Sequence, residues 1–165
     1  TLLNALTRSD VHVENRLFAT LDPSSRRLKF PQDLEVIITD TVGFIRDLPK
    51  ELMAAFRATL EELENADLLL HVIDISNPQH QTQVRAVERI LAELGLDTIT
   101  AIRVLNKQDR IDAATQARLV RTLDGVPVSA THRSSLRPLI KRMTAELSAA
   151  QRPAPEIQAT AADCD

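Results

Sequence analysis

Two short polar segments of this 165-residue chain carry carboxylates in settings that suit nucleotide chemistry. In the first, Asp40-Thr41-Val42-Gly43, the Asp40 carboxylate can orient water on Mg²⁺, a hard cation that keeps several waters. Gly43 lets its backbone N–H approach a terminal phosphate without an intervening side chain. An ordinary aspartate at a turn followed by a loop glycine has the same pattern. This segment alone therefore leaves a phosphate site and a plain turn both open.

The second segment is Asn106-Lys107-Gln108-Asp109. The carboxylate of Asp109 can accept two parallel hydrogen bonds from the N1–H and amino group of guanine. Adenine lacks that N1–H, and a polar site of this kind discriminates by roughly 10⁴. Asn106 can tie neighbouring loops together, and the apolar stem of Lys107 can lie over the base. A solvated polar turn is the alternative, but beside the first segment the pattern favours a guanine nucleotide.

Two further segments follow the order that a nucleotide would need. Backbone amides of Ser129-Ala130-Thr131 can meet the guanine O6, although this triplet is uninformative by itself. In the early loop LFATLDP, the Thr20 hydroxyl can coordinate Mg²⁺ while its amide meets the γ-phosphate, as in loops that triphosphate orders and hydrolysis releases. A loop anchored to the core by Phe18 and Leu21 is the alternative.

The rest of the chain predicts the elements that position these segments. The order from residue 67 onward is strand, helix, strand, helix, strand, helix, which requires right-handed crossovers and a mostly parallel sheet. Ligands bind such sheets at the carboxyl ends of the strands, and the apolar strand at 67–75 is expected to be buried on both faces. We predict strands at 27–30, 35–39, 67–75, 98–105 and 126–129, and helices at 1–8, 49–65, 84–94, 113–123 and 136–149.

Composition excludes several classes of protein. The formal charge of −3 argues against a general polyanion binder. The single cysteine, Cys164, excludes a disulfide scaffold. Apolar stretches are too short to span a bilayer, and the start shows no signal segment, so a reducing cytoplasm is expected. We expect a domain at 1–150 and a disordered tail at 151–165, where proline and alanine dominate.

The segments LFATLDP, DTVGFIRDLP, AFRATLEE and LNKQD together resemble the G domain of HflX-type GTPases over about residues 1–150. The resemblance implies a P-loop GTPase-type three-layer α/β/α fold with a mostly parallel sheet. It also implies GTP hydrolysis to GDP and phosphate with Mg²⁺, association with the large ribosomal subunit, and a cytoplasmic protein that we expect to be a monomer.

The resemblance gives each matching position a role. Thr20 and, through water, Asp40 would serve the metal, and Gly43 the γ-phosphate. Asn106 and Asp109 would select guanine. The expected GTP-binding residues are Phe18, Ala19, Thr20, Leu21, Asp22, Asp40, Thr41, Val42, Gly43, Asn106, Lys107, Asp109, Ser129, Ala130 and Thr131.

One departure concerns the phosphate cradle. The glycines are Gly43, Gly95 and Gly125, so the 165 residues hold no GxxxxGK[ST] loop, and Thr1-Leu2 resembles the residues just after it. We therefore expect a chain cut immediately after the P-loop, without the first strand, which would lie between the strands ending at Asp40 and starting near residue 67. Unpaired apolar edges should then make the isolated chain unstable and a poor GTP binder.

Two more positions bear on the chemistry. Phe44 stands where many GTPases have a glutamine that orients the attacking water, so we assign no catalytic residue and expect hydrolysis to need a partner. Phe44 packed against the sheet is an equally simple alternative. After Ala130 the chain has Thr131-His132-Arg133 in place of a glycine-containing turn, which leaves the guanine contact to backbone amides.

Two other functions stay open. One is a non-enzymatic interaction module that keeps remnants of the family, and the other is a GTPase of another ribosome-assembly family. Selective binding of GTP over ATP would argue against the first of these.

Overall fold

The computed structural model describes residues 2–7, 24–29, 35–40 and 62–150. In chain order its elements are α1 (Leu2–Thr7), β1 (Ser24–Lys29), β2 (Glu35–Asp40), the 3₁₀ helix η2 (Glu62–Asn65), β3 (Leu69–Asp74), α3 (His80–Glu93), β4 (Ala101–Asn106), the 3₁₀ helix η3 (Gln108–Arg110), α4 (Ala113–Leu123), β5 (Gly125–Pro127), the 3₁₀ helix η4 (Arg133–Leu136) and α5 (Arg137–Ala150).

The described strands form two sheets. β1 and β2 make an antiparallel hairpin in which Ser24 lies opposite Asp40. β3, β4 and β5 form a parallel sheet in that order, with Asp74 at the end of β3 opposite Asn106 at the end of β4. The alternation of strands and helices therefore produces the parallel sheet that the sequence predicts, and the carboxyl ends of its strands share one edge.

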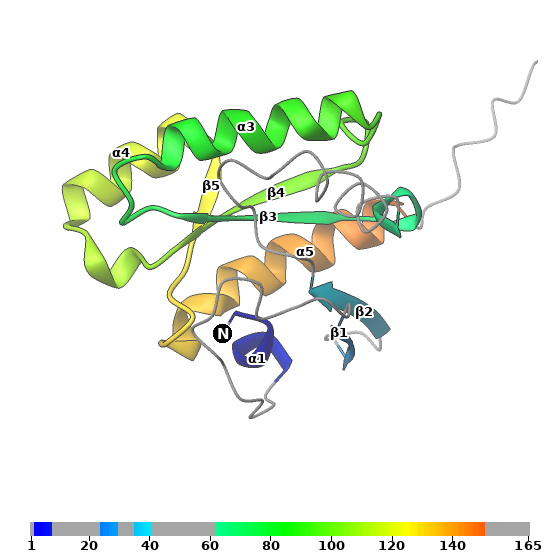
Figure 1. The fold of residues 1–165 in the computed structure, drawn as a ribbon. Coiled ribbons are helices and arrows are strands. Elements are labelled where there is room, and N and C mark those ends of the chain that lie inside the picture. The colour runs from blue at the N-terminus through cyan, green and yellow to red at the C-terminus, as the bar shows by residue number, and fades with distance from the viewer. Residues whose placement is uncertain (1, 8–23, 30–34, 41–61, 151–165) are drawn as a thin grey trace, which may run out of the picture.

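Helices cover both faces of this parallel sheet. α3 and α4 lie on one side of it, and α5 and α1 lie on the other (Figure 1). β4 contributes side chains to the cores on both faces of the sheet. Ile102 and Val104 belong to the core under α5, whereas Leu105 belongs to the core under α3 and α4. This alternation is the period of two that a strand covered on both faces requires. The result is the three-layer α/β/α arrangement.

The larger of the two cores joins both sheets. Its buried residues come from α1, β4, Val128 just after β5, and the segment from η4 through α5. Leu28, Val36 and Ile38 of the hairpin pack against them. The buried members are Leu6, Ile102, Val104, Val128, Leu136, Leu139, Met143 and Leu147. The hairpin is thus held by side-chain packing against the same core rather than by strand pairing with β3.

Several helix and strand ends follow from local chemistry. α4 begins after Asp112, whose carboxylate accepts a 2.9 Å hydrogen bond from the Thr115 N–H, as an N-cap should. α3 ends before Gly95, which has a positive φ of 71° and so follows the helix as a left-handed C-terminal residue. These two ends agree with the sequence prediction within one or two residues.

Other boundaries differ from the prediction. β1 starts at Ser24 rather than at 27, and β4 starts at Ala101 rather than at 98. The chain before β4 still turns, because the Ile99 N–H donates to the Leu96 carbonyl at 3.2 Å. β5 covers Gly125–Pro127 rather than 126–129, although the Val128 N–H continues the pairing through a 2.9 Å bond to the Leu105 carbonyl.

The prediction that the strand at 67–75 is buried on both faces is wrong at its centre. Val72 of β3 is 46% exposed, and Ile37 of β2 is 66% exposed. Within the part of the chain that the structure describes, β2 and β3 each pair on one side only. An apolar sequence indicates that a strand can be buried, but whether it is buried depends on which elements pack beside it.

His71 of β3 gives the fold a pH dependence. It lies opposite Arg103 of β4, which forms a 2.8 Å ion pair with Glu88 of α3. Burial lowers the pKa of His71, with a further lowering by Arg103 and an opposing effect of Glu88. Because the folded state favours the neutral imidazole, this stabilisation is complete above the unfolded pKa of about 6.5. It is lost as the pH falls from there toward the lowered native pKa.

We therefore expect the urea concentration at the midpoint of unfolding to decrease as the pH is lowered from 7.5 to 5.5. His71→Gln should make this decrease smaller. His132→Gln, which removes an exposed histidine, is the control for the substitution of a histidine by glutamine. An unchanged pH slope in His71→Gln would show that other groups carry the effect.

Candidate nucleotide-binding site

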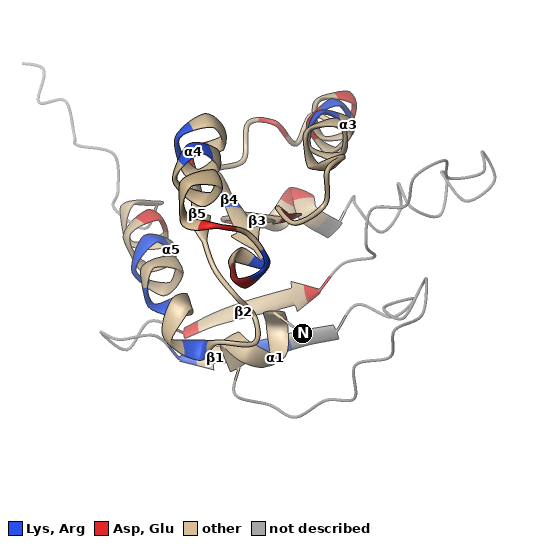
Figure 2. Cartoon of the chain, turned by 90° about the vertical axis from the view of Figure 1, so that its left-hand side faces the viewer, with Lys and Arg blue, Asp and Glu red and all other residues tan. Residues whose placement is uncertain are grey.

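The polar segments after β3, β4 and β5 lie at the same edge of the parallel sheet. Figure 2 views the molecule from this side. The strand ends are aligned by register, since Asp74 lies opposite Asn106, and the Ile75 N–H then donates to the Asn106 carbonyl at 3.2 Å. This edge is where parallel α/β sheets hold their ligands.

Asn106 joins the loops that follow β4 and β5. Its Oδ1 accepts one hydrogen bond of 2.8 Å from the Lys107 N–H and another of 3.1 Å from the Ala130 N–H. A third bond, from the Gln108 N–H to the Val128 carbonyl at 3.1 Å, connects the same two loops. The side chain therefore makes the tie between loops that its position after a strand suggests, and it fixes two parts of the candidate site relative to each other.

Lys107 adopts an uncommon backbone conformation. Its φ of 65° is left-handed, a region that costs a residue with a Cβ about 1–2 kcal/mol. The turn is closed by the Arg110 N–H, which donates to the Lys107 carbonyl at 3.0 Å. The Nζ of Lys107 lies 2.6 Å from Oδ2 of Asp74 at the end of β3. Residues held in such conformations gather at functional sites, so this one marks the loop as a candidate binding element.

Asp109 is an exposed carboxylate beside Ser129. A hydrogen bond from the Ser129 side chain is the main cause that lowers the pKa of Asp109. Burial opposes this, and the charges of His132 and Arg110 add to the lowering. Asp109 is therefore ionised at neutral pH and acts only as a hydrogen-bond acceptor. An ionised carboxylate is the group that can receive both the N1–H and the amino group of guanine.

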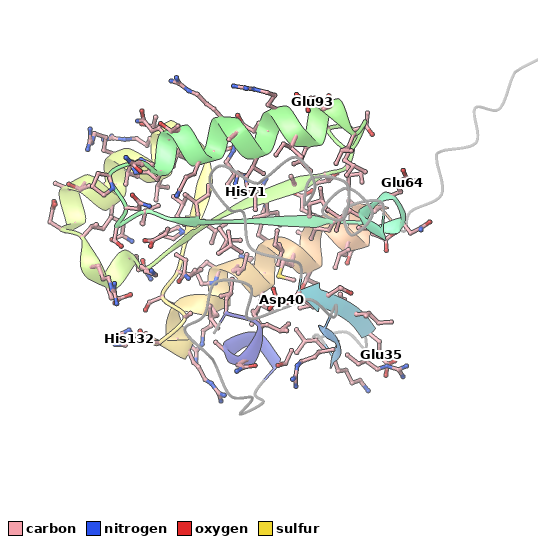
Figure 3. All side chains as sticks on the ribbon, viewed as in Figure 1. Glu35, Asp40, Glu64, His71, Glu93 and His132 are labelled. Carbon is pink, nitrogen blue, oxygen red and sulfur yellow. The ribbon has the colours of Figure 1, made fainter. Side chains whose placement is uncertain are left out.

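The loop after β5 uses its own polar atoms to hold its shape. Ser129 is 2% exposed, and its N–H donates to Ser135 Oγ at 2.8 Å. Its hydroxyl lies 2.8 Å from Thr131 Oγ1 and 3.1 Å from His132 Nδ1. His132 thus occupies the turn that lacks a glycine, on the loop that leads into η4 and α5 (Figure 3).

This network reduces the number of backbone amides of residues 129–131 that could donate to the guanine O6. The Ser129 N–H donates to Ser135, and the Ala130 N–H donates to Asn106. The third N–H, that of Thr131, has no hydrogen-bond acceptor among the described residues. A base at this edge would find that donor most readily available.

Of the remaining predicted site residues, the structure describes only Asp40. Asp40 is exposed at the end of β2, in the other sheet (Figure 3). Phe18 to Asp22, Thr41 to Gly43, and Phe44 lie outside the described residues. Among the residues that the structure describes, there is no group of three or more His, Cys, Asp or Glu side chains set to hold a metal ion.

One residue at this edge, Asp74, was missed by the sequence prediction. Asp74 accepts hydrogen bonds at Oδ1 from the N–H and Oγ of Ser76, at 3.0 and 2.6 Å, besides its ion pair with Lys107. The available signal was a carboxylate at the end of a predicted strand, which is the feature that singled out Asp40.

The three-layer fold, with polar segments at the carboxyl ends of its parallel strands, is that of an α/β domain of the GTPase class. The profile of the family described as 50S ribosome-binding GTPase matches residues 1–107. GTPase HflX of Caldanaerobacter subterraneus subsp. tengcongensis is 54% identical over 112 residues, which are 68% of this chain and 26% of that protein. GTPase HflX of Magnetococcus marinus is 43% identical over 146 residues, which are 87% of this chain and 33% of that protein.

Among solved structures, a complex of SsGBP and GDP superposes with a TM-score of 0.71 at 26% identity, over 90% of this chain and 50% of that one. The chain therefore belongs to the 50S ribosome-binding GTPase family, as a G domain of the HflX type. It spans 26% and 33% of the length of the two HflX relatives named above.

Proposed function

We propose that this chain is the guanine-nucleotide-binding part of a ribosome-associated GTPase that converts GTP to GDP and phosphate. One observation carries the proposal: the Asn106 side chain binds the Ala130 N–H and so fixes the loop of Asp109 against the loop of Ser129. A base placed between these loops has an ionised carboxylate on one side and a backbone donor on the other. That pairing fits the edge of guanine and leaves adenine without a partner for the carboxylate.

Each residue of this edge has a distinct part in the proposal. Asp109 accepts the N1–H and the amino group of the base, and the Thr131 N–H is the donor available to O6. The alkyl stem of Lys107 covers one face of the ring, as long side chains do when their charged end is held elsewhere. Asn106 contributes to guanine selection by keeping the two loops in register, through the bonds that its Oδ1 accepts from both.

The phosphates and their metal would lie toward β2. The exposed carboxylate of Asp40 is a hard oxygen donor and fits Mg²⁺, which is usually held by one or two carboxylates and water. We propose that Asp40 holds the ion through water, with Thr20 as a second ligand and Gly43 facing the γ-phosphate. The ion, when bound, neutralises charge that develops on the phosphates.

Hydrolysis is proposed to depend on a partner. Phe44, which follows Gly43, has no group that can orient an attacking water, and phosphoryl transfer relies on positioning and electrostatics. The name of the matching family points to the large ribosomal subunit as that partner. We propose the cytoplasm as the location. In the described part of the chain, no helix has the length and apolar character needed to cross a membrane.

The proposal is tested by titrating the chain with GDP and with ADP while the backbone amide resonances are followed by NMR. We expect GDP to bind more tightly and to shift the amides of Asn106, Asp109 and Thr131. Titration to millimolar nucleotide is needed, because the 165 residues contain no GxxxxGK[ST] loop to hold the phosphates. Equal affinity for the two nucleotides would contradict the proposal and favour a nucleotide-independent interaction module.

A further inference from the structure

The ion pair between Lys107 and Asp74 links two strand ends that are far apart in the sequence. The Lys107 Nζ lies 2.6 Å from Asp74 Oδ2, across a separation of 33 residues. Lys107 begins the loop after β4, and Asp74 is the last residue of β3. The aliphatic stem of the lysine is therefore tethered at both ends, by its own backbone and by the neighbouring strand.

Asp74 is itself held in place. Its other oxygen, Oδ1, accepts the Ser76 N–H at 3.0 Å and lies 2.6 Å from the Ser76 hydroxyl. Its backbone is fixed by pairing with Asn106. Burial raises the pKa of Asp74, but the hydrogen bonds from Lys107 and Ser76 outweigh this and leave the pKa below its usual value. The carboxylate is thus charged and oriented across the neutral pH range.

This pair contributes little to the stability of the fold. The Lys107 and Asp74 side chains are 41% and 33% exposed, and ion pairs this open to water add little to the free energy of unfolding. Its effect is on conformation instead. A free lysine side chain samples many rotamers, and ordering it on binding weakens the affinity.

We infer that Asp74 is a positioning residue of the base site, which holds the Lys107 stem across the place of the guanine ring before the nucleotide arrives. The inference rests on the proposed function and adds to it a residue that touches no nucleotide atom.

The test is the affinity of the full chain for GDP, measured in wild type, Asp74→Asn, Lys107→Met and the double variant. Asp74→Asn keeps the shape but removes the charge, and we expect it to weaken GDP binding by about three- to tenfold, the effect of ordering one flexible side chain. Lys107→Met keeps an apolar stem without the ammonium group and should reproduce that loss. In the double variant, Asp74→Asn should add nothing further.

Salt separates positioning from a general structural defect. The ratio of wild-type to Asp74→Asn affinity should shrink as NaCl is raised from 50 mM to about 1 M, because salt screens a partly exposed pair. Glu88→Gln is the matched control: it breaks the 2.8 Å pair of Glu88 and Arg103, whose side chains are 44% and 38% exposed, on α3 and the middle of β4. It should leave GDP affinity unchanged.

The outcomes distinguish the two levels of the proposal. If wild type does not prefer GDP to ADP, the proposed function fails and this inference fails with it. If wild type prefers GDP but Asp74→Asn and Lys107→Met bind it as tightly as wild type, only the positioning role of Asp74 is overturned. Additive losses in the double variant would likewise overturn it, since they would show that the two residues act independently.

Discussion

Asp109→Asn is expected to abolish the preference of this chain for guanine over adenine nucleotides. The ionised carboxylate accepts two hydrogen bonds from guanine, whereas an amide presents an oxygen and an NH₂ group, so one of the two bonds becomes a donor facing a donor. Polar sites that lose their matched partner lose discrimination of up to about 10⁴. Competition between GDP and ADP, followed by NMR on the amides of residues 106–131, measures the change.

The same prediction can be made from the side of the ligand. Inosine diphosphate keeps the N1–H and O6 of guanine but lacks the amino group, so it removes one hydrogen bond to Asp109. A hydrogen bond to a charged group is worth about 1.5–3 kcal/mol, which corresponds to roughly ten- to hundredfold in affinity. Wild type should therefore prefer GDP to inosine diphosphate by that factor, and Asp109→Asn should lose this preference and bind inosine diphosphate at least as tightly as GDP.

Asp112→Asn is the matched control, because it makes the same chemical change three residues further on. The Asp112 carboxylate accepts from Thr115 N at 2.9 Å and begins α4, and asparagine is an equally good N-cap. Its guanine preference should equal that of wild type. If Asp112→Asn and Asp109→Asn lost selectivity together, the loop as a whole rather than the Asp109 carboxylate would be responsible.

Leu139→Ala is expected to lower the free energy of unfolding by about 2–5 kcal/mol, the range for buried leucines replaced by alanine. Leu139 of α5 is 0% exposed and lies in the core cluster that also contains Val104 of β4 and Val128. The substitution removes apolar contacts and leaves a cavity between α5 and the sheet. Urea denaturation followed by circular dichroism gives the difference.

Ile37→Ala is the control for a large apolar residue outside the core. Ile37 is 66% exposed, so its loss should change stability by no more than about 0.5 kcal/mol. Because Val36 and Ile38 of the hairpin pack against the same cluster as Leu139, the two sheets should unfold in one transition. Equal losses from Leu139→Ala and Ile37→Ala would contradict this division of the core.

Much of the fold was predictable because local rules set it. The helix at 113–123 was predicted with the bounds that α4 has, and the structure shows that Asp112 caps its first turn. Strand ends were less predictable. The backbone at Val128 continues to pair with Leu105 after β5 has ended, and no local signal in the sequence separates such a bond from a regular strand.

The candidate site was predicted in the same uneven way. Asn106, Lys107 and Asp109 were found because three polar residues after an apolar strand form a compact pattern. Asp74 was missed, because its partner Lys107 is 33 residues away and only the pairing of β3 with β4 brings them together. The hydrogen bonds that the Ser129 and Ala130 N–H groups donate could not be predicted either, because their acceptors, Ser135 and Asn106, lie in other turns of the chain.

The amino-acid sequence by itself determined the alternation of strands and helices, the parallel sheet and the polar residues at its carboxyl edge. These features depend on periodicity and on groups within a few residues of one another. The tertiary structure alone decided which strand faces stay exposed, as at Val72, and which polar groups meet, as in the pair of Asp74 and Lys107. Both depend on which strands become neighbours, and that is settled only when the whole core packs.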